Sequence, residues 1–233
     1  MLVLHPGQQA TAMTRTLTRL AIALALASPL PAFAAEDISK VNGSVETSAG
    51  GTYGDLETVN GAVHVAENVQ AQDASTVNGS IQVGTGARLQ SVETVNGAIR
   101  LGRNVQVADN IETVNGSVFV DQGGTVGGSV ETVNGAIGLV RTEVARGLET
   151  VNGDITVGIG SHVRGGITVE RPSGWFQGTS KRRPKVVIGP DAVVEGPLEF
   201  RREVSLYVHK TARTGPVTGA EPVVFETETA PQD

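Results

Sequence analysis

Residues 92–101 read VETVNGAIRL, and variants of this stretch return along most of the chain. The tripeptide Val-Asn-Gly occurs seven times, at steps of 18, 18, 18, 19, 19 and 18 residues. The copies begin at Val41, Val59, Val77, Val95, Val114, Val133 and Val151. A short fixed period is typical of repeat architectures, in which one small unit stacks on itself. The sequence therefore predicts a long fold built from similar coils.

Each repeat contains a short β-prone run, an Asn-Gly corner and a second run in which apolar and variable residues alternate. In the stretch quoted above, period-two alternation predicts that Ile99 and Leu101 point inward and Arg100 outward. Two other copies repeat this pattern around an outward residue: Val63-His64-Val65 and Val118-Phe119-Val120. A third apolar run, such as 105–107, follows. Three strands and three bends in 18–19 residues predict a triangular coil of a single-stranded parallel β-helix.

The Asn-Gly pairs are expected to form the same corner in every coil. Glycine supplies a positive φ or a close approach without a Cβ clash, and asparagine tolerates the same backbone region. Stacked Asn side chains can form an amide ladder. Asn-Gly also favours β-hairpins, but the rest of each unit is too short and polar for two further core strands. The predicted corner residues are Asn42, Gly43, Asn60, Gly61, Asn78, Gly79, Asn96, Gly97, Asn115, Gly116, Asn134, Gly135, Asn152 and Gly153.

Residues 1–34 have the features of a secretory signal peptide. Two arginines precede a short apolar core at 20–27, and 32–34 (Ala-Phe-Ala) fit the small-x-small cleavage pattern. Met13 is a possible true start. We therefore expect a mature protein that begins near Ala35 and is exported to the periplasm or the cell exterior.

We expect the β-solenoid to span residues 35–219 in about nine to ten coils, because weaker repeats continue beyond the last Val-Asn-Gly. Its rod would be about 45 Å long at the spacing of paired strands. The polar, Pro-containing segment 171–185 reads as an excursion loop, and 220–233 as an acidic tail or cap. No stretch after the leader is long enough to span a membrane as a helix.

The composition excludes several classes of protein. The chain has no Cys, so disulfides and a lipid-modified N-terminal cysteine are both excluded. Beyond the leader, 16 basic residues stand against 24 acidic ones, a net charge of −8. Non-specific binding to nucleic acid depends on positive charge, so we expect none. The aromatic residues number only eight, which suits a narrow core of aliphatic side chains.

The ETVNGAI-type repeats, the short coil and the leader resemble bacterial secreted β-solenoids of the adhesin type. The coil geometry is also similar to that of bactofilins, polymer-forming bacterial cytoskeletal proteins. The resemblance covers about residues 38–219 and implies a right-handed coil. The six-residue spacing of Ile99, Val105 and Ile111 also fits a left-handed hexapeptide helix. Bactofilins are typically cytosolic or membrane-associated, whereas this chain carries a leader.

A recurrent glutamate precedes Thr-Val-Asn-Gly and is the first candidate for a functional stripe. Stacked carboxylates about 5 Å apart repel one another and raise their pKa values unless a cation intervenes. Oxygen ligands suit Ca²⁺, so a weak metal stripe is one reading and a solvated face, which we favour, is the other. The residues are Glu57, Glu93, Glu112, Glu131 and Glu149.

The valine of each Val-Asn-Gly is a second candidate. Strict alternation puts Val59 and its equivalents outside, where they would form an apolar stripe for self-association. A bulge at the corner would instead turn them inward, and we favour this buried valine ladder.

The excursion loop combines the chain's aromatic pair with its densest cluster of cations. These side chains would contact a glycan, an anionic lipid or a partner, or the aromatic pair would cover an edge of the core. The candidate contact residues are Trp175, Phe176, Lys181, Arg182, Arg183 and Lys185.

No pattern of catalytic residues accompanies the repeats. The four histidines are isolated, and no nucleophile elbow, phosphate loop or His-x-His pair occurs. We therefore expect a non-enzymatic structural or adhesin-like protein without a cofactor, which presents a repetitive face to a surface, a cell-surface glycan or another copy. A homopolymer-forming scaffold is the alternative, and a small polysaccharide-active β-helix enzyme is the third reading.

Overall fold

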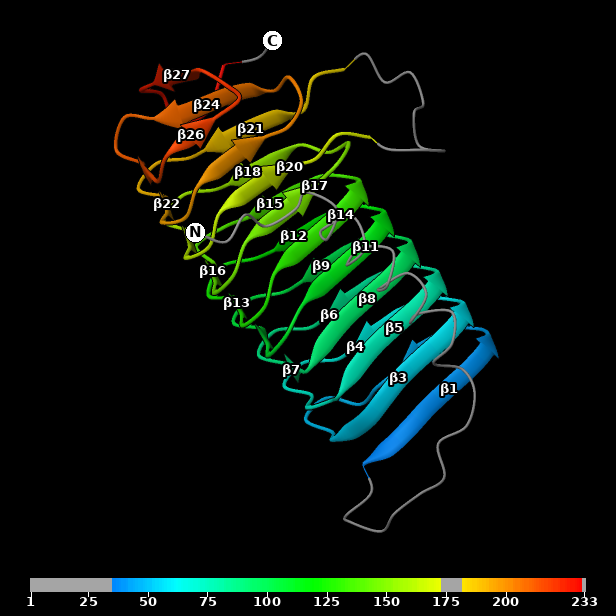
Figure 1. The fold of residues 1–233 in the computed structure, drawn as a ribbon. Coiled ribbons are helices and arrows are strands. Elements are labelled where there is room, and N and C mark those ends of the chain that lie inside the picture. Colours follow the sequence, from blue (N-terminus) through cyan, green and yellow to red (C-terminus); the bar gives the residue numbers. More distant parts are fainter. Residues whose placement is uncertain (1–34, 173–181, 232–233) are drawn as a thin grey trace, which may run out of the picture. The chain divides into compact units, whose positions relative to one another are not determined.

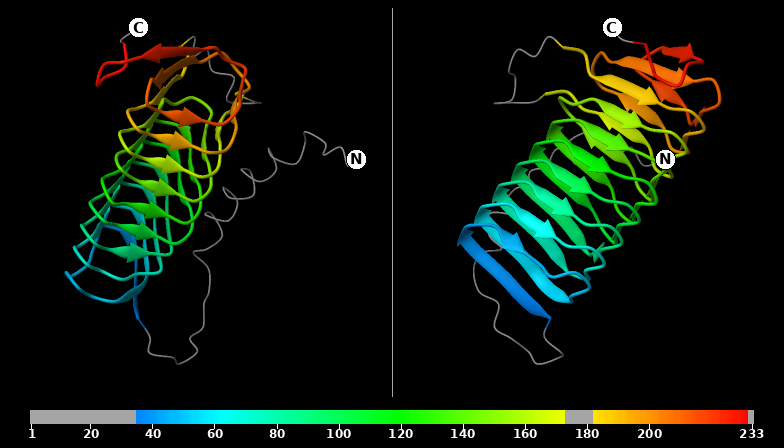
Figure 2. Two further views of the ribbon diagram at one scale, coloured as in Figure 1. Left: turned by 90° about the vertical axis from the view of Figure 1, so that its left-hand side faces the viewer. Right: turned by 180° about the vertical axis from the view of Figure 1, so that it is seen from behind.

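The computed structural model describes residues 35–172 and 182–231, and these form a β-solenoid of about ten turns (Figure 1). Three parallel sheets wrap around one apolar interior, and the described residues contain no helix. Successive coils lie above one another, as the two further views in Figure 2 show. The predicted architecture, with short coils that repeat at the Val-Asn-Gly period, is confirmed.

Each sheet contains one side of every coil. Sheet A consists of β1 (Glu36–Asn42), β3 (Tyr53–Asn60), β5 (Asp73–Asn78), β8 (Ser91–Asn96), β11 (Ile111–Asn115), β14 (Val130–Asn134), β17 (Leu148–Thr150), β20 (Ile167–Val169), β23 (Leu198–Phe200) and β26 (Val217–Thr218). Sheet B consists of β2 (Val45–Glu46), β4 (Val63–Val65), β6 (Ile81–Val83), β9 (Ile99–Leu101), β12 (Val118–Val120), β15 (Ile137–Leu139), β18 (Ile155–Val157), β21 (Lys185–Ile188), β24 (Ser205–His209) and β27 (Pro222–Phe225). Sheet C consists of β7 (Arg88–Leu89), β10 (Gln106–Val107), β13 (Thr125–Val126), β16 (Glu143–Val144), β19 (His162–Val163), β22 (Val193–Val194) and β25 (Arg213–Thr214).

The register places equivalent residues of successive repeats directly above one another. Ile111 of β11 pairs with Val92 below it and Val130 above it, and all three are fully buried. Ile99 and Leu101 point into the core, and Arg100 points out, as the alternation predicted. The core is therefore a set of aliphatic columns, which are stabilised by burial along the whole solenoid.

The Asn-Gly corner joins sheet A to sheet B, and here glycine is required for close approach. A Cβ on Gly116 would lie 1.8 Å from the carbonyl oxygen of Gly97 in the coil below. Among the seven corner glycines, a positive φ occurs only at Gly43, where φ is 103°. At this corner, a positive φ therefore requires glycine in the first coil alone.

Most of the residues with a positive φ lie instead at the corner between sheets B and C, which the repeat motif did not single out. In most coils this corner carries Gly, Asn or Asp, the residues that tolerate a positive φ. Arg141 is the exception, with a φ of 43°. The column consists of Gly50, Asn68, Gly86, Asn104, Gly123, Arg141, Gly160 and Asp191.

The expected excursion interrupts the corner between sheets A and B. The chain leaves sheet A after β20 and rejoins sheet B at Lys185, the first residue of β21. The 220–233 segment, expected to be a tail or a cap, contributes β27, which pairs in parallel with β24. Phe225 of β27 is buried and packs edge-on against His209. The last strand of sheet B therefore lies beyond the boundary at residue 219.

Candidate functional site

The outer face of sheet A carries the recurrent glutamates in one column. Glu93, Glu112, Glu131 and Glu149 occupy four successive coils in register, so neighbouring backbones are about 4.8 Å apart. Glu57 continues this column below, separated from Glu93 by Ser75. The predicted glutamate stripe is therefore continuous from Glu93 to Glu149 and interrupted once above Glu57, and each of its side chains is partly buried.

A second acidic column lies beside the first, two residues earlier on the strands of the first coils. The backbone N–H of Asp55 donates to Oδ1 of Asp37 at 3.0 Å, and that of Asp73 donates to Oδ1 of Asp55 at 3.4 Å. The hydroxyl of Ser91 donates to Oδ1 of Asp73 at 2.7 Å. These hydrogen bonds hold the aspartates in line, so the first coils of sheet A carry an aspartate column beside the single Glu57.

Burial, and then repulsion from neighbouring carboxylates, raises the pKa values of Glu57, Glu93, Glu112 and Glu149. Burial raises the pKa of Glu112 to about 7, and the charges of Glu131 and Glu93 add to this, while a hydrogen bond from Asn110 opposes it. The pKa of Glu149 is also raised to about 7, mainly by burial and then by Glu131 and Glu170, while Arg201 opposes the shift. Burial likewise raises the pKa values of Asp55, Glu57 and Glu93. The charged form is therefore less favourable at these positions than in water.

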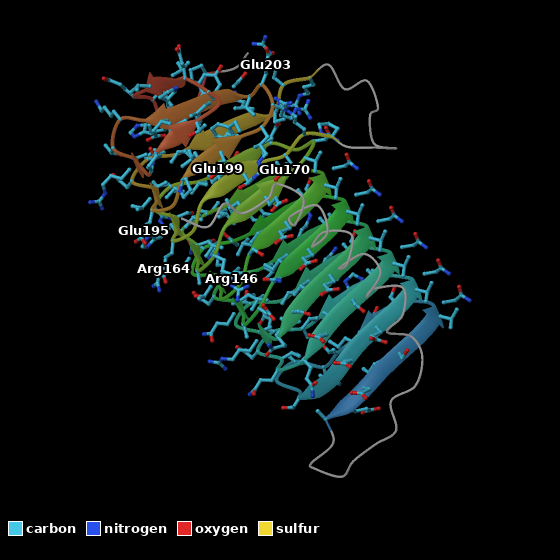
Figure 3. The ribbon with its side chains drawn as sticks, viewed as in Figure 1. Arg146, Arg164, Glu170, Glu195, Glu199 and Glu203 are labelled. Atoms are coloured by element: carbon cyan, nitrogen blue, oxygen red, sulfur yellow. The ribbon has the colours of Figure 1, made fainter. Side chains whose placement is uncertain are left out.

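Cations are paired with acids elsewhere on the described part of the solenoid, but the glutamate column has no such ion pair. The first cation on the outer face of sheet A above the column is Arg201, which contacts Glu170 at 2.7 Å and Glu199 at 3.7 Å. Figure 3 shows these two glutamates near each other on the upper coils. Within residues 35–172 and 182–231, the glutamates below them form no ion pair, although the charge of Arg201 acts on Glu149.

The valines of Val-Asn-Gly form a column on the same outer face. In β5, Ala74 and Thr76 are buried, while Ser75 and Val77 face outward. The valines from Val41 to Val114 therefore face outward, against the expectation that a bulge turns them inward, whereas Val133 and Val151 are buried but lie outside the core cluster. The inward position belongs to the preceding threonine, whose hydroxyl donates to the corner carbonyl of the coil below, for example from Thr94 to Gly79 at 3.1 Å. The acidic column thus has an aliphatic column next to it.

The predicted amide ladder is present at the corner. Each asparagine donates from Nδ2 to Oδ1 of the asparagine one coil below, at distances from 2.9 to 3.2 Å. The ladder runs from Asn42 to Asn152, where Nη1 of Arg202 donates to the last Oδ1 at 2.6 Å. Sequence reasoning missed Arg202, because its partner lies 50 residues away in the chain.

The described cations of the excursion loop already have partners. Arg182 forms an ion pair with Asp154 at 2.6 Å, and Arg183 forms one with Glu203 at 3.0 Å. The ammonium of Lys185 lies 4.8 Å from the centre of the Tyr207 ring and bonds to the carbonyl of Pro231. Trp175, Phe176 and Lys181 lie outside the described residues. The described part of the loop base therefore stabilises the upper coils.

Other candidate sites are weak in the part of the chain that the structure describes. A shallow groove on the outer face of sheet B is lined by residues that include Glu46, His64 and Gln82 from neighbouring strands. Among the described residues, no group of three or more metal-ligating side chains is arranged to hold a metal ion. In the same residues, no helix has the length and apolar character to cross a membrane.

Comparison with known proteins gives no match: neither a protein-family model, nor a curated protein, nor a solved structure is significantly similar to this chain. The function is therefore inferred from the geometry of the solenoid.

The raised pKa values predict that stability falls as the pH rises. An unfolded glutamate ionises near 4.5, whereas Glu112 and Glu149 keep their protons to about 7. The free energy of unfolding should therefore decrease between about pH 4.5 and 7 and then level off. The double variant Glu112→Gln/Glu149→Gln should be more stable than the wild type at pH 8, by about 1–2 kcal/mol after allowance for solvent screening, and similar at pH 4.5.

Urea unfolding at the two pH values measures this difference. The exposed pair Glu46→Gln/Glu67→Gln makes the same charge change elsewhere and should follow the wild type at both pH values. An equal gain for the two double variants at pH 8 would show that net charge, and not the column, is responsible.

Proposed function

We propose that this protein is an exported, non-enzymatic β-solenoid that uses the outer face of sheet A as an adhesive surface for a partner with repeated cationic groups. The observation that carries this proposal is the glutamate column, which lies in register and has no ion pair among the described residues. The resemblance to secreted β-solenoids of the adhesin type and the leader-like residues 1–34 support the exported role.

Repetition makes such a face effective although each contact is weak. One solvent-exposed ion pair contributes about 0–1 kcal/mol. A partner with linked cations would engage several carboxylates at once, and linkage converts the later contacts into intramolecular ones. Beside Glu93 and Glu112, the partly exposed Val95 and Val114 offer aliphatic contact, which suits lysine or arginine side chains with apolar stems. A nucleic acid or another polyanion would instead be repelled.

Binding of the folded protein to poly-L-lysine tests the proposal. The variant Glu93→Gln/Glu112→Gln/Glu131→Gln should bind roughly 10- to 100-fold more weakly, because three contacts are lost from the centre of the column. The control Glu46→Gln/Glu67→Gln/Glu221→Gln removes the same charge from exposed positions elsewhere and should bind almost as the wild type does. Equal losses in both variants would mean that only net charge matters, and undiminished binding by the first variant would exclude the column.

The alternative, a homopolymer-forming scaffold, is favoured by a different observation. Within residues 35–172 and 182–231, the first and last strands of sheets A and B each have a neighbour on one side only, and such edges are templates for pairing with another chain. Negative-stain electron microscopy separates the two proposals, because a polymer would appear as filaments of constant width.

A further inference from the structure

The strand β1 forms an open edge at the N-terminal end of the solenoid. It has seven residues, and among the described strands its one neighbour is β3. All of its residues are exposed except Ile38, which is partly buried against the core. A long edge strand with unpaired backbone groups can take up another strand.

The direction of the unpaired groups can be derived from the corner. The N–H of Gly43 donates to the carbonyl of Asn60 in the coil above, at 2.9 Å. Backbone groups alternate from side to side along an extended strand, so those of Glu36, Ile38 and Lys40 point to the free edge. These three residues can therefore form hydrogen-bonded pairs with an added strand.

Alternation along β1 places Glu36 and Lys40 on the same inner face of sheet A as Ile38, since the register shift between Glu36 and Ile38 comes from one extra residue in β3. Ile38 stacks below the buried Leu56, and Lys40 stacks below the buried Thr58. The inner face of β1 thus reads, in order, acidic, apolar and basic. An identical strand that runs antiparallel presents the same order reversed, so the pattern is complementary to itself.

We propose that two copies of the chain join head to head through antiparallel pairing of their β1 strands about a two-fold axis at Ile38. Glu36 of each copy then lies opposite Lys40 of the other, and the two Ile38 side chains meet on the axis. All three pairs are of the hydrogen-bonded type, in which the partners exchange both N–H···O bonds. On the outer face, Asp37 lies opposite Ser39 of the second copy, so no like charges meet directly.

A parallel, head-to-tail addition is less suitable at this edge. It would place the ammonium of Lys40, which already donates to the carbonyl of Ser44 at 2.6 Å, in the core position that threonine fills in the coils above. An inward-pointing charge on an edge strand is a known obstacle to such stacking. In the antiparallel pair, the same ammonium has a carboxylate opposite it.

The other end of the solenoid is less suited to pairing, so the assembly should stop at two copies. The carbonyl of Phe225 accepts from the N–H of Lys210 in the coil below, which turns the backbone of Pro222 to the free edge. Proline has no N–H to donate there. The last strand of sheet A, β26, has only two residues.

Sedimentation velocity on residues 35–233, a compact unit that holds every described strand, tests the dimer. One coil end is a small interface, so we expect a dissociation constant on the order of 1–100 µM. Lys40→Glu or Glu36→Lys should each weaken the dimer roughly 10- to 100-fold, because two symmetric attractive pairs become repulsive. The double swap Glu36→Lys/Lys40→Glu should restore it.

The control Lys210→Glu makes the same charge change near the opposite end, where Lys210 pairs with Glu226, and should leave the dimer unchanged. A wild type that stays monomeric up to millimolar concentration, single swaps that dimerise normally, a double swap that stays weak, or filaments would each overturn the proposal. The dimer does not depend on binding to poly-L-lysine, so the two experiments can fail separately.

Discussion

Gly116→Ala should lower the free energy of unfolding by about 3–5 kcal/mol, a loss that few single-methyl changes cause. The added Cβ would lie 1.8 Å from the carbonyl oxygen and 2.5 Å from the carbonyl carbon of Gly97, which are backbone atoms of the coil below. The contact can be relieved only if the two coils separate at the corner. That movement would break the hydrogen bond from the N–H of Gly97 to the carbonyl of Asn115 and disturb the amide ladder beside it.

Thermal or urea unfolding followed by circular dichroism measures this loss. Gly138→Ala is the matched control, because its Cβ would meet only the ring of Phe119, at 3.3 Å on the exposed face of sheet B. The ring can move, and alanine suits a strand better than glycine, so we expect a change below about 1 kcal/mol. Equal effects at both positions would show that close approach at the corner does not limit the stacking.

Ile111→Asp should be at least as destabilising, at about 4–5 kcal/mol or more. Ile111 is fully buried in an aliphatic column between Val92 and Val130, and a carboxylate there has no partner. Because each coil contacts only its neighbours, the damage should spread outward from the middle of the solenoid. We expect hydrogen exchange to accelerate most in β8, β11 and β14, with protection retained in coils farther away.

Gln106→Asp provides the comparison five residues earlier, at the end of the preceding coil. Gln106 is exposed on sheet C and accepts a hydrogen bond from Nε of Arg88 at 3.3 Å, which a carboxylate can also accept. This variant should stay within about 0.5 kcal/mol of the wild type. A uniform increase in exchange along the whole chain in Ile111→Asp would argue that the solenoid unfolds as one cooperative unit.

The architecture could be predicted because the repeat and the alternation point to the same structure. The Val-Asn-Gly period fixes the register of sheet A, and the second run of each repeat shows which residues face the core. Asn96 and its equivalents recur at the same corner of every repeat, and this recurrence predicts that their side chains stack in a ladder. The glutamate column follows from the same register.

The remaining features depend on contacts that the repeat does not encode. The side on which the valines lie depends on Thr58 and its equivalents, most of whose hydroxyls donate to a corner carbonyl of the coil below. The partners of Arg182 and Arg202 lie in distant parts of the sequence. The left-handed column between sheets B and C uses Gly, Asn and Asp interchangeably, so no fixed motif marks it.

The amide ladder has a net dipole along the axis of the rod. Every amide in it donates toward the N-terminal coil and accepts from the coil above, so the small dipoles of the side chains add along the axis, as those of peptide groups do in a helix. The oxygen-bearing pole at Asn152 contacts the guanidinium of Arg202, a cation of the sign that this pole attracts. The hydrogen-bearing pole at Asn42 lies next to the open edge of β1. The two ends of the rod therefore differ in electrostatic potential as well as in shape.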